Sequence, residues 1–282
     1  MTNILNSFRF SSHLLEEFPG AYAAYSLRQL SSSHTLSIRV RRDDNNEQDI
    51  GFAGGRLDTL AISNFCGASA GYVASLYDAS PNGFDMSAST PSTQPKIYEG
   101  SAGLVVQNNN PAIQFDGVDD VLTNSNLNIS RISMFAVAEK QDSGSLLLLM
   151  NPAAPNQALH EIAYTSVFSN YQDLSFYRPG SSLSGGSSLG SATGAQHLLS
   201  YFHDGAGSTL DSYQVAENEN TLSLSTSGPF GYIAEISSIG ARSIQGILYY
   251  PGKVQEIVIY NNDQSLNRGA IESNINTFYS IF

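Results

Sequence analysis

The sequence predicts an all-β fold, a two-sheet antiparallel sandwich of the jelly-roll type with a few short helices and a short C-terminal helix. Hydrophobic residues make up 41% of the 282 residues and charged residues only 13%, so small polar side chains supply most of the polarity, as in turn-rich β proteins. Residues 254–260 carry apolar side chains too densely for a strand with one exposed face, which indicates a central strand packed against a second sheet. Elsewhere, short runs of alternating polarity are separated by turn residues, as expected for further strands.

The N-terminal segment, residues 1–19, mixes apolar and polar side chains without a single period. It is expected to be either an arm or the first strand of the sandwich, and the sequence leaves both open. The remainder, residues 20–282, is expected to form one domain, because all-β domains of this length commonly fold as one unit.

Short helices and strands are expected to alternate at the start of that domain. The Ala-rich run 20–30 predicts a short helix. Residues 35–41 alternate between apolar and polar side chains and predict a strand, which leaves two arginines on its polar face. Residues 57–66 have helical spacing, and residues 71–78 predict a second strand.

The C-terminal region, residues 234–260, is expected to organise the sheets. Its strand patterns flank a turn at Gly240-Ala241-Arg242 and another at Pro251-Gly252, which predicts a β-hairpin unit. Apolar residues then recur at helical spacing over 266–278 and predict a closing amphipathic helix.

The charge balance excludes one class of partner. The formal net charge is -12, with 13 Lys and Arg against 25 Asp and Glu, and this argues against nucleic-acid binding, which needs a basic surface. No apolar run is long enough to span a bilayer, and the N-terminus lacks a secretion-signal pattern, so neither membrane insertion nor secretion is expected. The single cysteine, Cys66, excludes an intramolecular disulfide and is expected to be a small buried hydrophobe.

Two segments resemble a known fold class. The strand Gly252–Tyr260, of the type G-K-x-x-E-I-x-I-Y, and the element Phe115–Leu122, of the type F-D-G-x-D-D-x-L, resemble concanavalin A-like and laminin G-like lectin and glucanase sandwiches. This resemblance implies a fold and not an activity, because many unrelated functions use such sandwiches.

A more specific resemblance covers roughly residues 20–85. This region is similar to the opening of the catalytic domain of α-L-arabinofuranosidase B, glycoside hydrolase family 54, whose run is Tyr-Asp-Gln-Ser-Gly-x-Gly-Asn-Asp. The chain keeps five positions of that run, Tyr77, Asp78, Ser80, Gly83 and Asp85. It replaces three others, with Ala79, Pro81 and Phe84.

The catalytic residues implied by this resemblance are not conserved in type. A retaining glycosidase needs two carboxyl groups about 5 Å apart. The family's acid/base position corresponds to Arg242, whose guanidinium does not give up its proton. The family's nucleophile loop corresponds to residues 151–156, which contain no carboxylate, although Glu161 follows. The family's vicinal cysteine pair is also absent, since only Cys66 lies near the matching place. The chain is therefore expected not to be an enzyme.

Two candidate ligand sites remain. Tyrosines can stack on sugar rings, and because the chain has no Trp the candidates are Tyr98, Tyr164, Tyr249 and Tyr250. Carboxylates can hold calcium, and the candidates are Asp116, Asp119 and Asp120, against the alternative that they cap backbone amides in an Asp-Gly turn. No other cofactor is expected, because the five His residues show no metal-ligand spacing.

The combination of an arabinofuranosidase-like opening, a laminin G-like sandwich and no acid/base pair resembles structural proteins of tailed bacteriophages. It predicts a non-catalytic virion structural protein of the capsid-decoration, head-fibre or tail-fibre type. Such a protein is expected at the virion surface, as a homo-oligomer in contact with capsid or tail proteins and with surface glycans as further ligands. A carbohydrate-binding module and an arabinofuranosidase-like glycoside hydrolase are the two open alternatives.

Overall fold

The structure of the protein is a computed structural model of residues 1–282. The structure describes residues 13–125, 127, 132–140, 145–150, 160–165, 173–178, 181–185, 194–203, 213–221, 224–227, 237–241 and 249–282. In chain order its helices and strands are α1 (Leu14–Glu17), β1 (Ala23–Ser26), β2 (Leu36–Arg42), β3 (Glu47–Ala53), β4 (Arg56–Leu57), α2 (Thr59–Cys66), β5 (Ala70–Leu76), β6 (Met86–Ser87), η1 (Pro91–Thr93), β7 (Lys96–Glu99), η2 (Gly100–Ala102), β8 (Val106–Gln107), β9 (Asn110–Pro111), β10 (Ile113–Asp116), β11 (Leu122–Asn124), β12 (Ile132–Lys140), β13 (Ser145–Met150), β14 (His160–Thr165), β15 (Asp173–Arg178), β16 (Ser181–Gly185), β17 (Gln196–His203), β18 (Tyr213–Glu217), β19 (Asn220–Thr221), β20 (Leu224–Ser227), β21 (Ser237–Ile239), β22 (Pro251–Tyr260), η4 (Ser265–Asn267) and α3 (Arg268–Tyr279).

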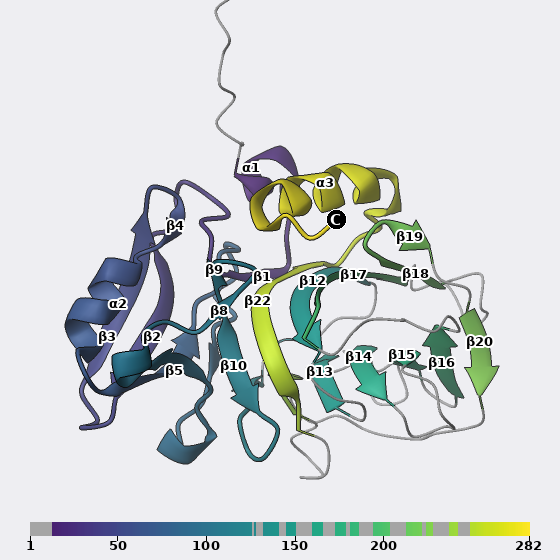
Figure 1. Ribbon diagram of the computed structural model, residues 1–282. Coiled ribbons are helices and arrows are strands. Elements are labelled where there is room, and N and C mark those ends of the chain that lie inside the picture. The colour runs from purple at the N-terminus through teal and green to yellow at the C-terminus, as the bar shows by residue number, and fades with distance from the viewer. Residues whose placement is uncertain are drawn as a thin grey trace, which may run out of the picture.

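The first sheet is built around β22, which has neighbours on both sides. β1 and β10 pair with one side of β22, and β12 pairs with the other. From β10 the sheet continues through β7, β5 and β2 to β3, and from β12 it continues through β17 to β18. Figure 1 shows this order from the early strands to the yellow β22 and on to β12. The predicted central strand at 254–260 is thus confirmed.

The second sheet packs against the first and makes the sandwich. Its order is β6, β11, β21, β13, β14, β15, β16 and β20, all antiparallel, and β5 joins the two sheets by pairing with both β7 and β6. The core between the sheets contains apolar side chains of both, such as Ile257 and Phe115 from the first and Leu122 and Ile239 from the second. The predicted all-β sandwich is confirmed, and Cys66 is buried in this core.

The outward face of the central strands is covered by helices. A second apolar cluster contains Phe135, Val258 and Tyr260 from the sheet and Ile271 and Ile275 from α3. Figure 1 shows α1 and α3 together above β1, β12 and β17. The closing helix predicted over 266–278 is therefore confirmed as α3, and its apolar stripe packs on the sheet.

A buried ion pair lies beneath α3. The Arg28 side chain donates from Nε to Glu256 Oε2 at 2.7 Å and from Nη2 to Glu256 Oε1 at 2.9 Å. The Ser26 hydroxyl donates to the same carboxylate at 2.8 Å, and the Tyr279 hydroxyl of α3 does so at 3.2 Å. Each polar group in this network has a partner, which burial requires.

Two sequence predictions differ from the structure, and a third, on residues 1–19, is only partly described. Residues 20–30 contain β1 (Ala23–Ser26) and not a helix, because pairing with β22 outweighs the helix preference of alanine. Pro251 and Gly252 do not form a turn but begin β22, paired with β10. The described part of 1–19 contains α1, with Leu14 fully buried in the α3 cluster; residues 1–12 lie outside the described residues, and the choice between an arm and a strand stays a prediction.

The β-hairpin unit predicted for 234–260 does not form between the described strands, because β21 pairs with β11 and β13 whereas β22 pairs with β1, β10 and β12. Three other local predictions agree with the structure. The strands predicted at 35–41 and 71–78 are β2 and β5, and the helix predicted at 57–66 is α2. The α2 helix begins where Asp58 accepts a hydrogen bond from the Ala61 amide at 2.9 Å, an N-cap interaction.

Candidate functional site

The candidate site begins as a row of polar side chains across four strands. The sheet register places Arg41 of β2 opposite Tyr72 of β5, Tyr72 opposite Lys96 of β7, and Lys96 opposite Gln114 of β10. Residues directly opposite each other share one face of a sheet. The residues next to them, Val40, Ile97 and Ile113, belong to the core, so the polar row lies on the outward face.

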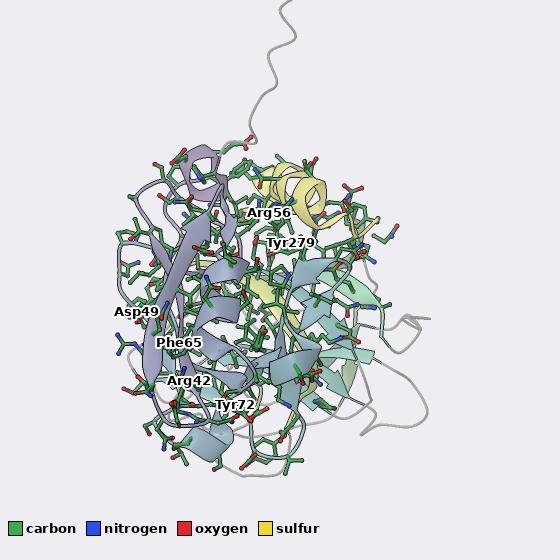
Figure 2. The ribbon with its side chains drawn as sticks, turned by 60° about the vertical axis from the view of Figure 1, so that its left-hand side comes forward. Arg42, Asp49, Arg56, Phe65, Tyr72 and Tyr279 are labelled. Carbon is green, nitrogen blue, oxygen red and sulfur yellow. The ribbon has the colours of Figure 1, made fainter. Side chains whose placement is uncertain are left out.

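Two loops close this face into a cavity of about 460 Å³. One is the loop 90–95, which contains η1, and the other is the acidic loop, residues 116–120, between β10 and β11. The Val121 amide donates to the Thr93 carbonyl at 3.0 Å and holds the two loops together. The cavity is lined by Arg41, Asp43, Tyr72, Pro91, Ser92, Gln94, Lys96, Gln114, Asp116 and Asp120. Figure 2 shows Tyr72 near the end of the molecule opposite α3.

One wall of the cavity is a fixed arginine. Arg41 is 7% exposed, and its Nε donates to Gln94 Oε1 at 2.6 Å while its Nη2 donates to the Pro91 carbonyl at 3.2 Å. Its guanidinium also lies 4.8 Å from the centre of the Tyr72 ring, a cation–π contact. Arg41 therefore holds the η1 loop and the Tyr72 ring in place.

The acidic loop forms the opposite wall. Asp116 Oδ1 accepts hydrogen bonds from the amides of Val118 at 2.7 Å and Asp119 at 3.2 Å, and Asp120 Oδ2 accepts from the Asp116 amide at 2.9 Å. Gly117 has a φ of 76°, and a Cβ built on it would lie 2.8 Å from the Pro251 Cβ, so a side chain at this position is disfavoured by both conformation and space.

Asp120 is the perturbed carboxyl of this wall. Its side chain is 6% exposed, and burial together with the neighbouring charge of Asp116 raises its pKa to about 7. Lys96 on the cavity floor acts in the opposite direction. An acid with such a pKa can donate a hydrogen bond or a proton near neutral pH.

The three predicted metal ligands come together in this loop. Asp116, Asp119 and Asp120 can each offer one carboxylate oxygen, and these oxygens lie within 4.8 Å of one another. The alternative, in which the carboxylates cap backbone amides of an Asp-Gly turn, is what the hydrogen bonds of Asp116 and Asp120 show. Calcium binding stays a prediction.

The predicted sugar-stacking tyrosines do not come together in the described structure. Tyr250 has no exposed surface and its ring packs against Phe115, and Tyr98 is only 9% exposed. Buried rings offer no face to a sugar, and both side chains belong to the core between the sheets. Tyr249 is half-buried beside Ala241, and the side chain of Tyr164 lies outside the described residues.

The positions that resemblance aligned with catalytic residues are only partly described. Arg242 and residues 151–156 lie outside the described residues, and Glu161 is described only as part of the β14 backbone. The chain just before Arg242 passes beside the acidic loop, since a Cβ built on Gly240 lies 2.9 Å from the Asp120 carbonyl oxygen.

Sequence reasoning missed the cavity floor. It placed two arginines on the polar face of 35–41 but assigned them no role, and it gave none to Tyr72, Lys96 or Gln114. The available signal was a polar residue inside each of several strand patterns, but only the register shows that these residues are neighbours.

Comparison with known proteins identifies the fold class. No family model matches the chain, and no curated protein matches it. Among solved structures, it is similar to a GH54 α-L-arabinofuranosidase soaked with a cyclic sulfate inhibitor, with a TM-score of 0.66 and 15% identity. A GH54 variant soaked with 4-nitrophenyl α-L-arabinofuranoside gives a TM-score of 0.64 and 13% identity. An arabinofuranosidase complexed with arabinofuranosyl-α-1,2-xylobiose gives 0.60 and 15%.

The share of each chain that the alignments cover limits the conclusion to the fold. Each alignment covers 94% of this chain and 64% of the enzyme chain, so the chain spans less than two thirds of these enzymes. The fold is therefore the β-sandwich of GH54 arabinofuranosidases, over much more of the chain than the residues 20–85 that the sequence resemblance covered. The concanavalin A-like assignment itself has no separate support.

These findings correct the predicted function. The structural neighbours are carbohydrate-active enzymes, and the prediction of a virion structural protein is wrong; the likeness favours its carbohydrate-directed alternatives. That prediction failed because a sandwich scaffold lacking a recognisable acid/base pair is compatible with many functions. Its capsid and tail partners and virion location were parts of the same prediction, and no observation on this molecule tests them. Within the described residues, no helix combines the length and apolarity needed to cross a bilayer.

Proposed function

We propose that this chain is a carbohydrate-binding domain that uses the arabinofuranosidase sandwich to bind arabinofuranosyl-containing glycans without hydrolysing them. The observation that carries the proposal is the likeness to GH54 arabinofuranosidases over 94% of the chain. One of these relatives is described as complexed with an arabinofuranosyl xylobiose. A concave, polar cavity on the described surface is consistent with a ligand that offers many hydroxyl groups.

The absence of hydrolysis is proposed from residue chemistry. The resemblance places Arg242 where the enzymes carry an acid/base, and a guanidinium cannot donate the proton that the leaving group needs. Asp116 and Asp120 do not replace the missing pair, because both come from one turn and each has an oxygen engaged by a backbone amide. A glycosidase pair must instead flank the scissile bond.

Calorimetric titration with arabinofuranosyl-xylobiose tests the binding, with unsubstituted xylobiose as the control ligand. We expect saturable binding that requires the arabinofuranosyl unit. Equal binding of both ligands, or of neither, would contradict the proposal.

The second candidate, a hydrolase, is favoured by the same structural neighbours and is tested by release of 4-nitrophenol from 4-nitrophenyl α-L-arabinofuranoside. We expect no release above background, because general acid/base catalysis alone contributes roughly 10²–10⁴-fold. Release that is lost in the Glu161→Gln variant would establish hydrolysis and overturn the non-enzyme assignment.

A further inference from the structure

We propose that the cavity between the acidic loop and the η1 loop is the saccharide site, and that it takes one or two neutral sugar rings held by Lys96, Gln114 and the acidic loop. This inference rests on the proposed function and gives it a place and a ligand class. It concerns the outward face of β5, β7 and β10, which the sequence did not single out.

The first argument is that several polar groups lining the cavity make few or no hydrogen bonds within the described part of the protein. The Arg41 guanidinium already donates hydrogen bonds to Gln94, Pro91, Arg42 and Asn45. Within the described residues, by contrast, the Gln114 amide and the Tyr72 hydroxyl make no hydrogen bond, and the Lys96 ammonium has only a loose contact with Glu99 at 4.0 Å. A row of polar groups that line a cavity without satisfying one another is suited to hydrogen bonding with a ligand.

The second argument is the neighbouring part of the same row, where the pattern is different. The register continues from Gln114 to Lys253 of β22 and from Lys253 to Glu139 of β12. There the ammonium of Lys253 lies 2.9 Å from Glu139 Oε2 and donates to Gln107 at 3.1 Å. The row is thus internally paired beneath the β8–β9 hairpin, whereas it is open in the cavity.

The third argument is the kind of ligand that the open groups select. Lys96, Tyr72 and the Gln114 nitrogen donate hydrogen bonds, while the Gln114 oxygen and the remaining oxygens of Asp116 and Asp120 accept them. Sugar hydroxyls do both. An anionic ligand would face the carboxylates of the acidic loop, and a cationic ligand would face Lys96 and Arg41, so a neutral polyol is the best match.

The size of the cavity limits the ligand. Its volume of about 460 Å³ lies in the lower part of the range of roughly 300–1,000 Å³ that is usual for small-molecule sites. Because Arg41 lies over the Tyr72 ring, stacking on that face is excluded, and recognition depends on hydrogen bonds.

The test uses the full chain, titrated by protein-observed NMR or calorimetry with arabinofuranosyl-xylobiose, gluconate and glucosamine. The first probe is neutral, the second anionic and the third cationic. The variants are Lys96→Met and Gln114→Leu, each half-buried at the cavity. Gln48→Leu on the exposed part of β3 is the matched control, because it makes the same change outside the cavity.

We expect the trisaccharide to bind wild type and the control equally. We expect each cavity variant to bind it about tenfold more weakly, as for the loss of one or two hydrogen bonds. Unfolding midpoints of all four proteins should agree, which excludes misfolding as the cause.

Three results would overturn the inference. Unchanged affinity in both cavity variants would place the glycan elsewhere and leave the proposed function standing. Preference for gluconate or glucosamine would refute the neutral ligand class. Failure of wild type to bind the trisaccharide would remove both the inference and the proposed function.

Discussion

Two parts of the outward face of the first sheet differ in polarity and in what covers them. Over β1, β22, β12 and β17 the face is apolar and α3 covers it, with the Arg28–Glu256 pair sealed underneath. Over β5, β7 and β10 the face is polar and two loops surround it without filling it. Figure 2 shows the separation, with Tyr279 at the C-terminal end of α3 and Tyr72 toward the far end of the molecule. Polar groups are thus buried and paired at one end, whereas at the other they line the cavity that we propose as the saccharide site.

The largest loss of stability is expected from a substitution beneath α3, on the covered part of the sheet face. The Glu256→Ala substitution leaves the Arg28 guanidinium buried without its carboxylate, and we expect a loss of about 3–5 kcal/mol in the free energy of unfolding. Denaturant unfolding of the purified protein measures this loss. The Arg28→Met/Glu256→Leu double variant is the control, since replacing both partners removes the unpaired charge. A double variant as unstable as Glu256→Ala would show that the ion pair itself is required.

The next effect is expected on the core side of the same strand. Ile257 is fully buried between the two sheets, so Ile257→Ala should cost about 2–5 kcal/mol through lost burial and a residual cavity. Thermal or denaturant unfolding checks this value. An unchanged midpoint would mean that β22 is not the central strand of the sandwich.

A smaller and pH-dependent effect is expected at the open face. The folded-state pKa of Asp120 is raised from 3.8 to about 7, so the stabilising contribution of its protonated form is complete below about pH 4 and is lost as pH rises through 7. Asp120→Asn keeps an oxygen that can accept from the Asp116 amide but cannot ionise. We expect the variant to gain about 1–3 kcal/mol over wild type between pH 4 and 8.

Unfolding curves measured at several pH values test this expectation. Asp119→Asn removes one negative charge from the same loop and is the matched control. A stability difference between Asp120→Asn and wild type that stays constant from pH 4 to 8 would show that Asp120 ionises normally.

The smallest change in stability is expected from substitutions on the cavity floor. Lys96→Met and Gln114→Leu remove groups that have little or no bonding to the protein, so the free energy of unfolding should change by no more than about 0.5 kcal/mol. Denaturant unfolding decides this. A loss comparable to that of Ile257→Ala would assign these side chains a structural role and would weaken the contrast between the two regions.

The sequence alone determined the features that depend on local patterns. Alternation with period two, dense apolar residues at 254–260 and helical spacing at 266–278 led to a sandwich, its central strand and α3, because these periodicities arise within one segment. The Asp-Gly pattern at 116–120 likewise led to a carboxylate cluster within one turn.

Tertiary structure decided the features that depend on pairing between distant segments. Residues 23–26 became a strand because β22, more than 200 residues later, offered a free edge to them. The tyrosine candidates Tyr98 and Tyr250 became buried through packing in the core between the sheets. Arg41, Tyr72, Lys96 and Gln114 became neighbours only through the register of the strands that carry them. The physical reason is that local preference is weak for a strand, whereas the position of a side chain on a sheet is fixed by cross-strand hydrogen bonds that the sequence of one segment does not contain.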